Sequence, residues 1–166
     1  TVTTEACTLY YDSDKKIPDF VVEQIKGAIK DLEKTTGKNF GGNHNPLLVS
    51  VRSGARVSMP GMMDTILNLG LNDTTVAAMV KETGNERFAY DSYRRFILMF
   101  TNIAKGYKRD EMDKMLDDIK KEKGYKFDWE VPAEDLKGLV VKYKAWYKDH
   151  VGEEFPNNPF DQLIER

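Results

Sequence analysis

The residues best suited to chemistry are concentrated in one stretch, residues 50–65. Arg52 and Arg56 alternate there with small residues such as Ser53, and two glycines let the backbone approach a ligand closely. An arginine side chain offers a planar fork of donors that matches phosphate or carboxylate. Core packing does not require this combination of residue types. The stretch therefore predicts a loop that recognises an anionic ligand.

Three methionines in the same stretch, Met59, Met62 and Met63, have two interpretations. Methionines often fill irregular gaps in a core. They also form a soft apolar wall against a flat aromatic group such as a purine. Because a proline, a glycine and Asp64 are interleaved with these methionines, the second interpretation is slightly favoured.

A second pair of arginines, Arg94 and Arg95, lies on a helix predicted over residues 86–105. The apolar residues of this helix recur at helical spacing and predict a core-facing stripe: Phe88, Tyr93, Phe96, Ile97, Phe100, Ile103 and Ala104. The two arginines flank the stripe. They are either solvated or salt-bridged surface residues, or one of them points toward the loop as a second phosphate clamp. The spacing alone leaves both alternatives open.

The elements that must position these residues are mostly helices. Helix starts and stops predict helices over 4–11, 18–35, 74–83, 86–105, 110–123 and 132–151, and a short one from Pro159. The expected caps are Thr3 or Thr4, Asn72 or Asp73, and Asn85 at the starts, and Gly37, Gly84, Gly106, Gly124 and Gly152 at the ends. An irregular loop is expected over 37–46, followed by a strand over 47–52 that leads into the arginine loop. The prediction is a helix-rich α+β fold with two or three strands.

Composition narrows the function classes. The 166 residues carry a net charge of −2 and a pI near 5.8, which argues against a general nucleic-acid binder. The single cysteine, Cys7, cannot form an internal disulfide and is interpreted as a small packing residue. No apolar run is long enough to cross a membrane, and the first residues do not resemble a secretory signal. Because no initiator methionine is present, the chain is expected to be processed or cut from a longer one.

Other candidate groups have structural interpretations. His44 and His150 lack partners at metal-ligand spacing, and a favourable charge at a helix end explains His150. The acidic residues of the helix over 110–123 alternate with lysines and predict a solvated face: Asp110, Glu111, Asp113, Asp117 and Asp118. Tyr143, Trp146 and Tyr147 are expected in the core. Neither GxxxxGK[ST] nor GxGxxG occurs, and no Ser-His-Asp or Cys-His pairing is indicated.

Residues 47–72, the pair Gly84-Asn85 and residues 87–96 closely resemble the pyruvate, phosphate dikinase family, and the resemblance is very specific in this middle part of the chain. Residues 1–7 and 153–156 fit the same family, and the resemblance is weaker over 102–150. The segment 58–64 favours the dikinase that uses phosphate and pyruvate over the related phosphoenolpyruvate synthases and glucan, water dikinases.

The resemblance implies ATP + phosphate + pyruvate giving AMP + pyrophosphate + phosphoenolpyruvate, with Mg2+ as cofactor. It implies an ATP-grasp-like nucleotide domain in which Arg52 and Arg95 contact the ATP phosphates. Arg56, Ser53 and residues 59–64 would lie in the same cleft. Positioned positive charge of this kind is what phosphoryl transfer requires. The phosphoryl group would pass to a histidine on a separate domain of the parent chain, and the parent is expected to be a homo-oligomer.

The family's phosphate-binding lysine segment, metal ligands, phosphohistidine domain and pyruvate-binding barrel have no counterpart in these residues. The chain is therefore expected to be a fragment without dikinase turnover of its own. Residues 1–106 would form the part that carries the motif, and residues 107–166 a helical continuation of the same domain. The alternatives are a stand-alone regulatory or binding module, and a nucleic-acid binder that uses Arg94, Arg95, Lys105, Lys108 and Arg109. The expected location is the cytoplasm.

Overall fold

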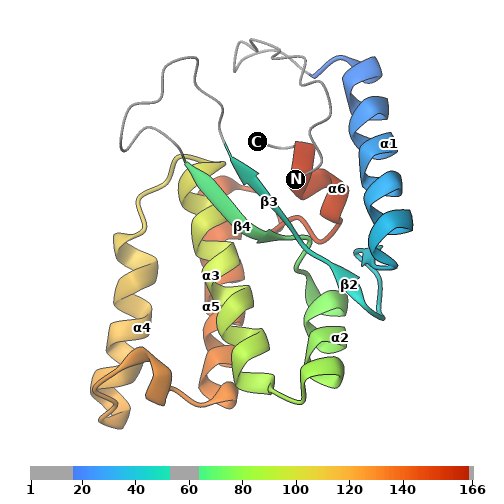
Figure 1. Ribbon diagram of the computed structural model, residues 1–166. Helices are drawn as coiled ribbons and strands as arrows, with labels where there is room; N and C mark the ends of the chain where they lie inside the picture. Colours follow the sequence, from blue (N-terminus) through green and yellow to red (C-terminus); the bar gives the residue numbers. More distant parts are fainter. Residues whose placement is uncertain (1–16, 53–63, 165–166) are drawn as a thin grey trace.

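The computed structural model describes residues 17–52 and 64–164 (Figure 1). Its first half contains α1 (Asp19–Thr36), β1 (Asn39–Phe40), β2 (Pro46–Leu47), β3 (Val49–Arg52), β4 (Thr65–Leu69) and α2 (Asp73–Thr83). Its second half contains α3 (Glu86–Ile103), α4 (Asp110–Lys123), the 3-10 helix η1 (Asp128–Glu130), α5 (Ala133–Val151) and α6 (Pro159–Ile164). The chain is a helix-rich α+β fold, as predicted. The helix expected over 4–11, Cys7 and the caps Thr3 and Thr4 lie outside the described residues.

The remaining predicted helices are confirmed within two residues at each end. Asn72 begins α2 with a reciprocal cap, because its side chain accepts from the Thr75 amide at 2.8 Å while the Thr75 hydroxyl accepts from the Asn72 amide at 2.7 Å. The Asn85 side chain accepts from the Phe88 amide at 2.9 Å and begins α3. Glycines in the left-handed conformation end α1, α2, α4 and α5. Helix α3 ends two residues before the predicted position, with Ala104 as its C-terminal cap, so the prediction that Gly106 ends it was wrong.

The strand predicted over 47–52 is divided at Leu48 between two small sheets. Strand β2 pairs in parallel with β1, which lies inside the segment predicted as an irregular loop, while β3 pairs antiparallel with β4. The prediction of one strand was wrong in this respect, because an unbroken apolar run does not reveal that its two halves face different partners.

A bulge in β4 sets the orientation of its side chains. Val49 pairs with Leu69 and Val51 with Ile66, so β4 contains one extra residue between the pairs, and Asn68 adopts φ 59°. The bulge allows Ile66 and Leu69 to be buried together although they are three residues apart. Leu67, between them, projects outward and is exposed.

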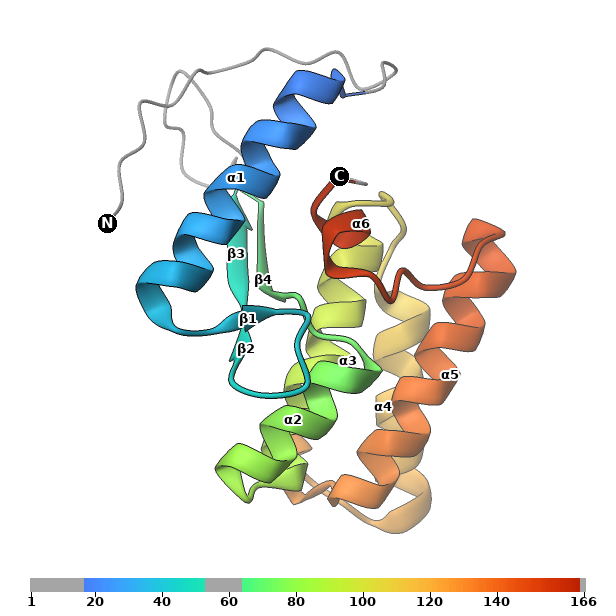
Figure 2. The ribbon, with the colours of Figure 1, turned by 90° about the vertical axis from the view of Figure 1, so that its right-hand side faces the viewer.

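The main core forms where α3 packs against α5 on one side and β4 on another (Figures 1 and 2). At its centre Phe155 makes edge-to-face contacts with Phe100 at 5.4 Å and with Tyr147 at 5.2 Å between ring centroids. Tyr143, Trp146 and Tyr147 are buried, which confirms their predicted place in the core. None of the described helices combines the length and the apolar character needed to cross a bilayer.

Candidate anion-binding cleft

A cleft of about 840 Å³ lies between β4, α3, α4 and η1. Its apolar lining residues are Leu67, Met79, Phe88, Leu98, Met99 and Leu116. Its charged lining residues are three arginines and three aspartates, namely Arg94, Arg95, Arg109, Asp91, Asp113 and Asp128. The volume falls in the usual range for small-molecule sites, and the lining offers a ligand both apolar contact and charge.

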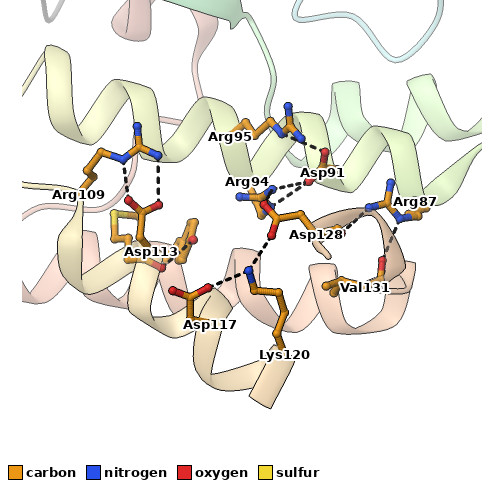
Figure 3. A network of polar contacts seen from close by, with 12 residues as sticks. Arg87, Asp91, Arg94, Arg95, Arg109, Asp113, Asp117, Lys120, Asp128 and Val131 are labelled. Atoms are coloured by element: carbon orange, nitrogen blue, oxygen red, sulfur yellow. Dashed lines mark hydrogen bonds and ion pairs between the residues drawn. The ribbon is translucent and has the colours of Figure 1, made fainter. Parts of the chain in front are cut away.

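Arg95 is the exposed member of the two α3 arginines that line the cleft. Its side chain is 59% exposed, and its Nε lies 3.0 Å from Asp91 Oδ2 (Figure 3). A guanidinium carries five N–H donors, so an ion pair through Nε leaves the edge formed by the two terminal nitrogens available for a bidentate ligand. Arg95 can therefore bind an anion without losing its contact with Asp91.

Arg94, the preceding residue, is in the opposite situation. Its side chain is only 4% exposed, and both its Nε and its Nη2 contact Asp91 Oδ1, at 2.9 and 2.7 Å. Its Nη2 also lies 3.8 Å from Asp128 Oδ2. The sequence left open whether these arginines were salt-bridged or one pointed inward. In the structure both are salt-bridged and both line the cleft, but Arg94 is buried and Arg95 is exposed.

Asp128 connects this pair to α4. Its Oδ1 accepts a hydrogen bond from Lys120 Nζ at 2.8 Å, and this bond, supported by the charges of Arg94 and Arg95, holds the pKa of Asp128 below its usual value. Arg87 anchors the same turn by donating to the Asp128 carbonyl at 2.7 Å and to the Val131 carbonyl at 2.9 Å. Side chains of α3 and α4 thus hold η1 in place beside the cleft (Figure 3).

The α4 side of the cleft carries a separate ion pair. Arg109 Nε lies 2.6 Å from Asp113 Oδ2, and its Nη2 lies 3.3 Å from Oδ1. This pairing raises the pKa of Arg109 above its ordinary value. Asp113 was predicted on a solvated face. Its side chain is 37% exposed, so it stays in contact with solvent, and the approach of α4 toward α3 also makes it part of the cleft lining.

Arg52 lies at the end of β3, directly opposite Thr65 of β4. Residues opposite each other in an antiparallel pair project from the same face, and so does a residue two positions further along a strand. Arg52 therefore shares a face of the β3–β4 ribbon with Leu67, which lines the cleft, while Val51 and Ile66 face the other way. Arg52 is exposed, and so is Asp64, which immediately precedes β4.

The structure thus brings Arg95 into the cleft and places Arg52 on a strand pair that borders it. Five other predicted site residues lie outside the described residues: Ser53, Arg56, Met59, Met62 and Met63. The sequence analysis did not select Asp91 or Asp128. The i, i+3 and i, i+4 spacing of Asp91 to Arg94 and Arg95 was a usable signal. Asp128 had none, because only the tertiary fold brings it to α3.

The two histidines lie away from the cleft. His44 is exposed, with its Nδ1 3.4 Å from Glu82. His150 lies in the last turn of α5, where its ring stacks on Trp146 at 3.9 Å between centroids. Within residues 17–52 and 64–164, no group of three or more His, Cys, Asp or Glu side chains could hold a metal ion.

Comparison with known proteins identifies the family. Residues 12–123 match the family described as "Pyruvate phosphate dikinase, AMP/ATP-binding domain", so the chain belongs to this family. The chain is 57% identical to pyruvate, phosphate dikinase of Clostridium symbiosum over 99% of its length, which is 19% of that relative. It is 50% identical to the Entamoeba histolytica enzyme over 98% of the chain and 18% of the relative. The chloroplastic enzyme of Mesembryanthemum crystallinum is 47% identical over 98% of the chain and 17% of the relative. The chain therefore spans about a fifth of the length of these relatives.

Proposed function

We propose that this chain forms part of the ATP-binding region of a pyruvate, phosphate dikinase. Arg52 and Arg95 would hold the ATP phosphates while a phosphoryl group passes to a histidine on another domain. The observation that carries this proposal is the cleft itself. An exposed arginine with an available donor edge lies there among apolar side chains, next to the strand that ends in Arg52.

The chemistry of the proposed role is electrostatic. In phosphoryl transfer, negative charge on the phosphate oxygens must be held in place, and the protein needs little covalent participation. Apolar lining residues such as Leu67 and Met99 would contact the purine, and the two arginines would bind the phosphates. The cleft's own arginines and aspartates are equal in number, so Arg52 would supply the net positive charge that the described lining lacks.

The wider role follows from the family resemblance. The complete reaction would convert ATP, phosphate and pyruvate into AMP, pyrophosphate and phosphoenolpyruvate, in an ATP-grasp-like domain. Mg2+ would arrive with ATP and neutralise part of its phosphate charge, with protein ligands outside this chain. The isolated chain would then lack dikinase turnover, and the phosphohistidine domain of the parent would be its partner.

The direct test is alanine substitution of each arginine in the native gene product. Each variant should raise the Kd for ATP by roughly 10- to 100-fold, as expected for loss of a hydrogen bond to a charged group. Adenosine affinity should not change, because adenosine has no phosphate. Lys148→Ala is a suitable control, since Lys148 pairs with exposed Glu154 and does not line the cleft. Parental ATP affinity in Arg52→Ala and Arg95→Ala would contradict the proposed roles.

The size of the native gene product tests the proposed context. An antibody raised against this chain should detect a protein several-fold larger than 19.0 kDa in source cells. A band near 19.0 kDa would instead support a free-standing binding module.

A further inference from the structure

We propose that Asp91 is a positioning residue that aims the terminal nitrogens of Arg95 at an anionic ligand in the cleft. The inference rests on the proposed role of Arg95 and adds to it a residue that never touches the ligand. It concerns ligands with phosphate groups, which the Arg95 fork would bind through its outer edge.

The two carboxylate oxygens of Asp91 contact different arginines. Oδ1 takes both contacts from buried Arg94, and Oδ2 takes the contact from exposed Arg95 (Figure 3). The carboxylate already has two contacts with Arg94, both through Oδ1, before Arg95 is considered. The contact with Arg95 is therefore not needed to compensate the buried charge of Asp91.

The contact also contributes little to folding, because an ion pair with an arginine that is 59% exposed is largely screened by water. Its main physical effect is on the freedom of the Arg95 side chain. A long side chain that is already held near its bound orientation loses less entropy when a ligand binds. The pair Asp91–Arg95 thus preorganises one half of the fork and leaves the other half available.

A positioning residue must itself be held firmly, and Asp91 is. Its side chain is only 13% exposed, and Arg94 connects it to Asp128. Asp128 in turn is bound by Lys120, which also pairs with Asp117 at 2.8 Å. This series of charges joins α3, η1 and α4, so the orientation of Arg95 depends on the assembled fold and not on α3 alone.

Asp91→Asn is the most selective test, because asparagine has the same shape but only one acceptor oxygen. Arg94 needs that oxygen for its two contacts, so the asparagine NH2 group would face Arg95 Nε. Two hydrogen-bond donors would then point at each other. We expect the Kd for ATP and for inorganic tripolyphosphate to rise about 3- to 10-fold, the effect of ordering one flexible side chain. Adenosine affinity should stay within about two-fold of the parent, since the loss concerns phosphate binding alone.

The measurement is made on the native gene product as a double-mutant cycle with Arg95→Ala. If Asp91 acts through Arg95, Asp91→Asn should have no further effect on ATP affinity once Arg95 is alanine. A purely structural role would weaken binding equally in both backgrounds, and that result would overturn the proposal.

Asp135→Asn provides a matched control. Asp135 is also 13% exposed and also pairs with a cation, Lys123, but it lies outside the cleft. It should lose less stability than Asp91→Asn, because Lys123 is 47% exposed whereas Arg94 is buried, and it should not change ATP affinity. Asp91→Glu keeps the negative charge that pairs with Arg94 but displaces the second oxygen, so it should give an intermediate loss of ATP affinity. This variant replaces Asp91→Asn in the test if Asp91→Asn does not fold.

The outcomes separate this inference from the proposed function. Parental ATP affinity in Arg95→Ala would remove the phosphate role of Arg95, and this inference with it. Weakened ATP binding in Arg95→Ala together with parental binding in Asp91→Asn would overturn the inference and leave the proposed function standing.

Discussion

The two sides of α3 show how one helix serves both stability and binding. The side toward α5 is an aromatic core in which Phe96 and Phe100 are fully buried against Phe155. The side toward α4 and η1 is a cleft in which Arg94, Arg95 and Asp91 are paired with one another. The core depends on packing volume, whereas the cleft depends on the placement of charge. Substitutions on the two sides should therefore affect different measurements.

The polar side chains of α3 have hydrogen-bond partners even where they are buried. Among the described residues, no buried side-chain nitrogen or oxygen lacks a hydrogen-bond partner. Unpaired polar groups in a core are costly, so the buried part of the cleft is expected to be rigid. Exposed Arg95 is the part whose pairing can be altered without unfolding the protein.

The largest expected effect is on the core side. Phe100→Ala should lower the free energy of unfolding by about 3–5 kcal/mol, because it leaves a cavity among the aromatic rings. Urea denaturation measures this loss. ATP affinity of the fraction that remains folded should stay near the parental value. A loss of stability below about 1 kcal/mol would mean that the core repacks freely around the missing ring.

Arg94→Ala and Arg95→Ala sharpen the comparison within the cleft, since the two residues are neighbours of identical chemistry. Arg94→Ala should cost about 3 kcal/mol of unfolding free energy, because it deprives Asp91 of its buried partner. Arg95→Ala should cost about 0–1 kcal/mol, as for other exposed ion pairs. Thermal and urea unfolding of both variants test this difference, and equal losses would contradict the assignment of Arg94 as the structural member.

Gln162 tests whether the C-terminal segment stabilises the core side. Its buried amide accepts from the Gly70 amide at 3.0 Å and donates to the carbonyls of Leu71 and Pro156 at 2.9 and 2.8 Å. Gln162→Ala should lower the free energy of unfolding by about 2 kcal/mol, because three backbone groups lose a partner. Exposed Asp161→Ala should change it by no more than about 0.5 kcal/mol. Similar effects of the two substitutions would show that the buried amide is dispensable.

The smallest expected effect is a loss of stability in alkaline solution. Burial raises the pKa of Tyr143 to about 12, compared with about 10 for an unfolded tyrosine. As the pH rises, the unfolded chain therefore releases this proton first. The contribution of Tyr143 to the free energy of unfolding is complete below pH 10 and is lost as the pH rises from 10 to 12. The loss should reach about 1 kcal/mol at pH 11. Tyr143→Phe should make the decline of the melting temperature shallower, and an unchanged decline would contradict the prediction.

Most helices could be predicted because their ends are encoded locally. Asn72 and Asn85 cap the amides that follow them, and glycines such as Gly84 and Gly124 adopt the left-handed conformation that ends a helix. These interactions involve residues within one or two turns of each other. The run around Arg52 was equally local and was sufficient to indicate the family, which the comparisons confirm.

The interior of the site could be predicted only in part. Arg95 was selected from its motif, and the structure places it in the cleft, but its role and that of Arg52 remain predictions. Asp128 could not be selected, because its side chain comes near Arg94 only when η1 folds back onto α3. The division of the strand at Leu48 likewise depends on which partner strand each half meets.

The sequence by itself thus determined the described helices, most of their caps, the family and most of the core stripe of α3. The prediction was wrong for Phe88, which is 49% exposed and lines the cleft. Only the tertiary structure decided which of two adjacent arginines is buried. Consecutive helical residues point about 100° apart, and either direction would satisfy the pattern of α3. The approach of α4 and η1 encloses Arg94 between Asp91 and Asp128 and leaves Arg95 exposed, because those two elements cover only one of the two directions.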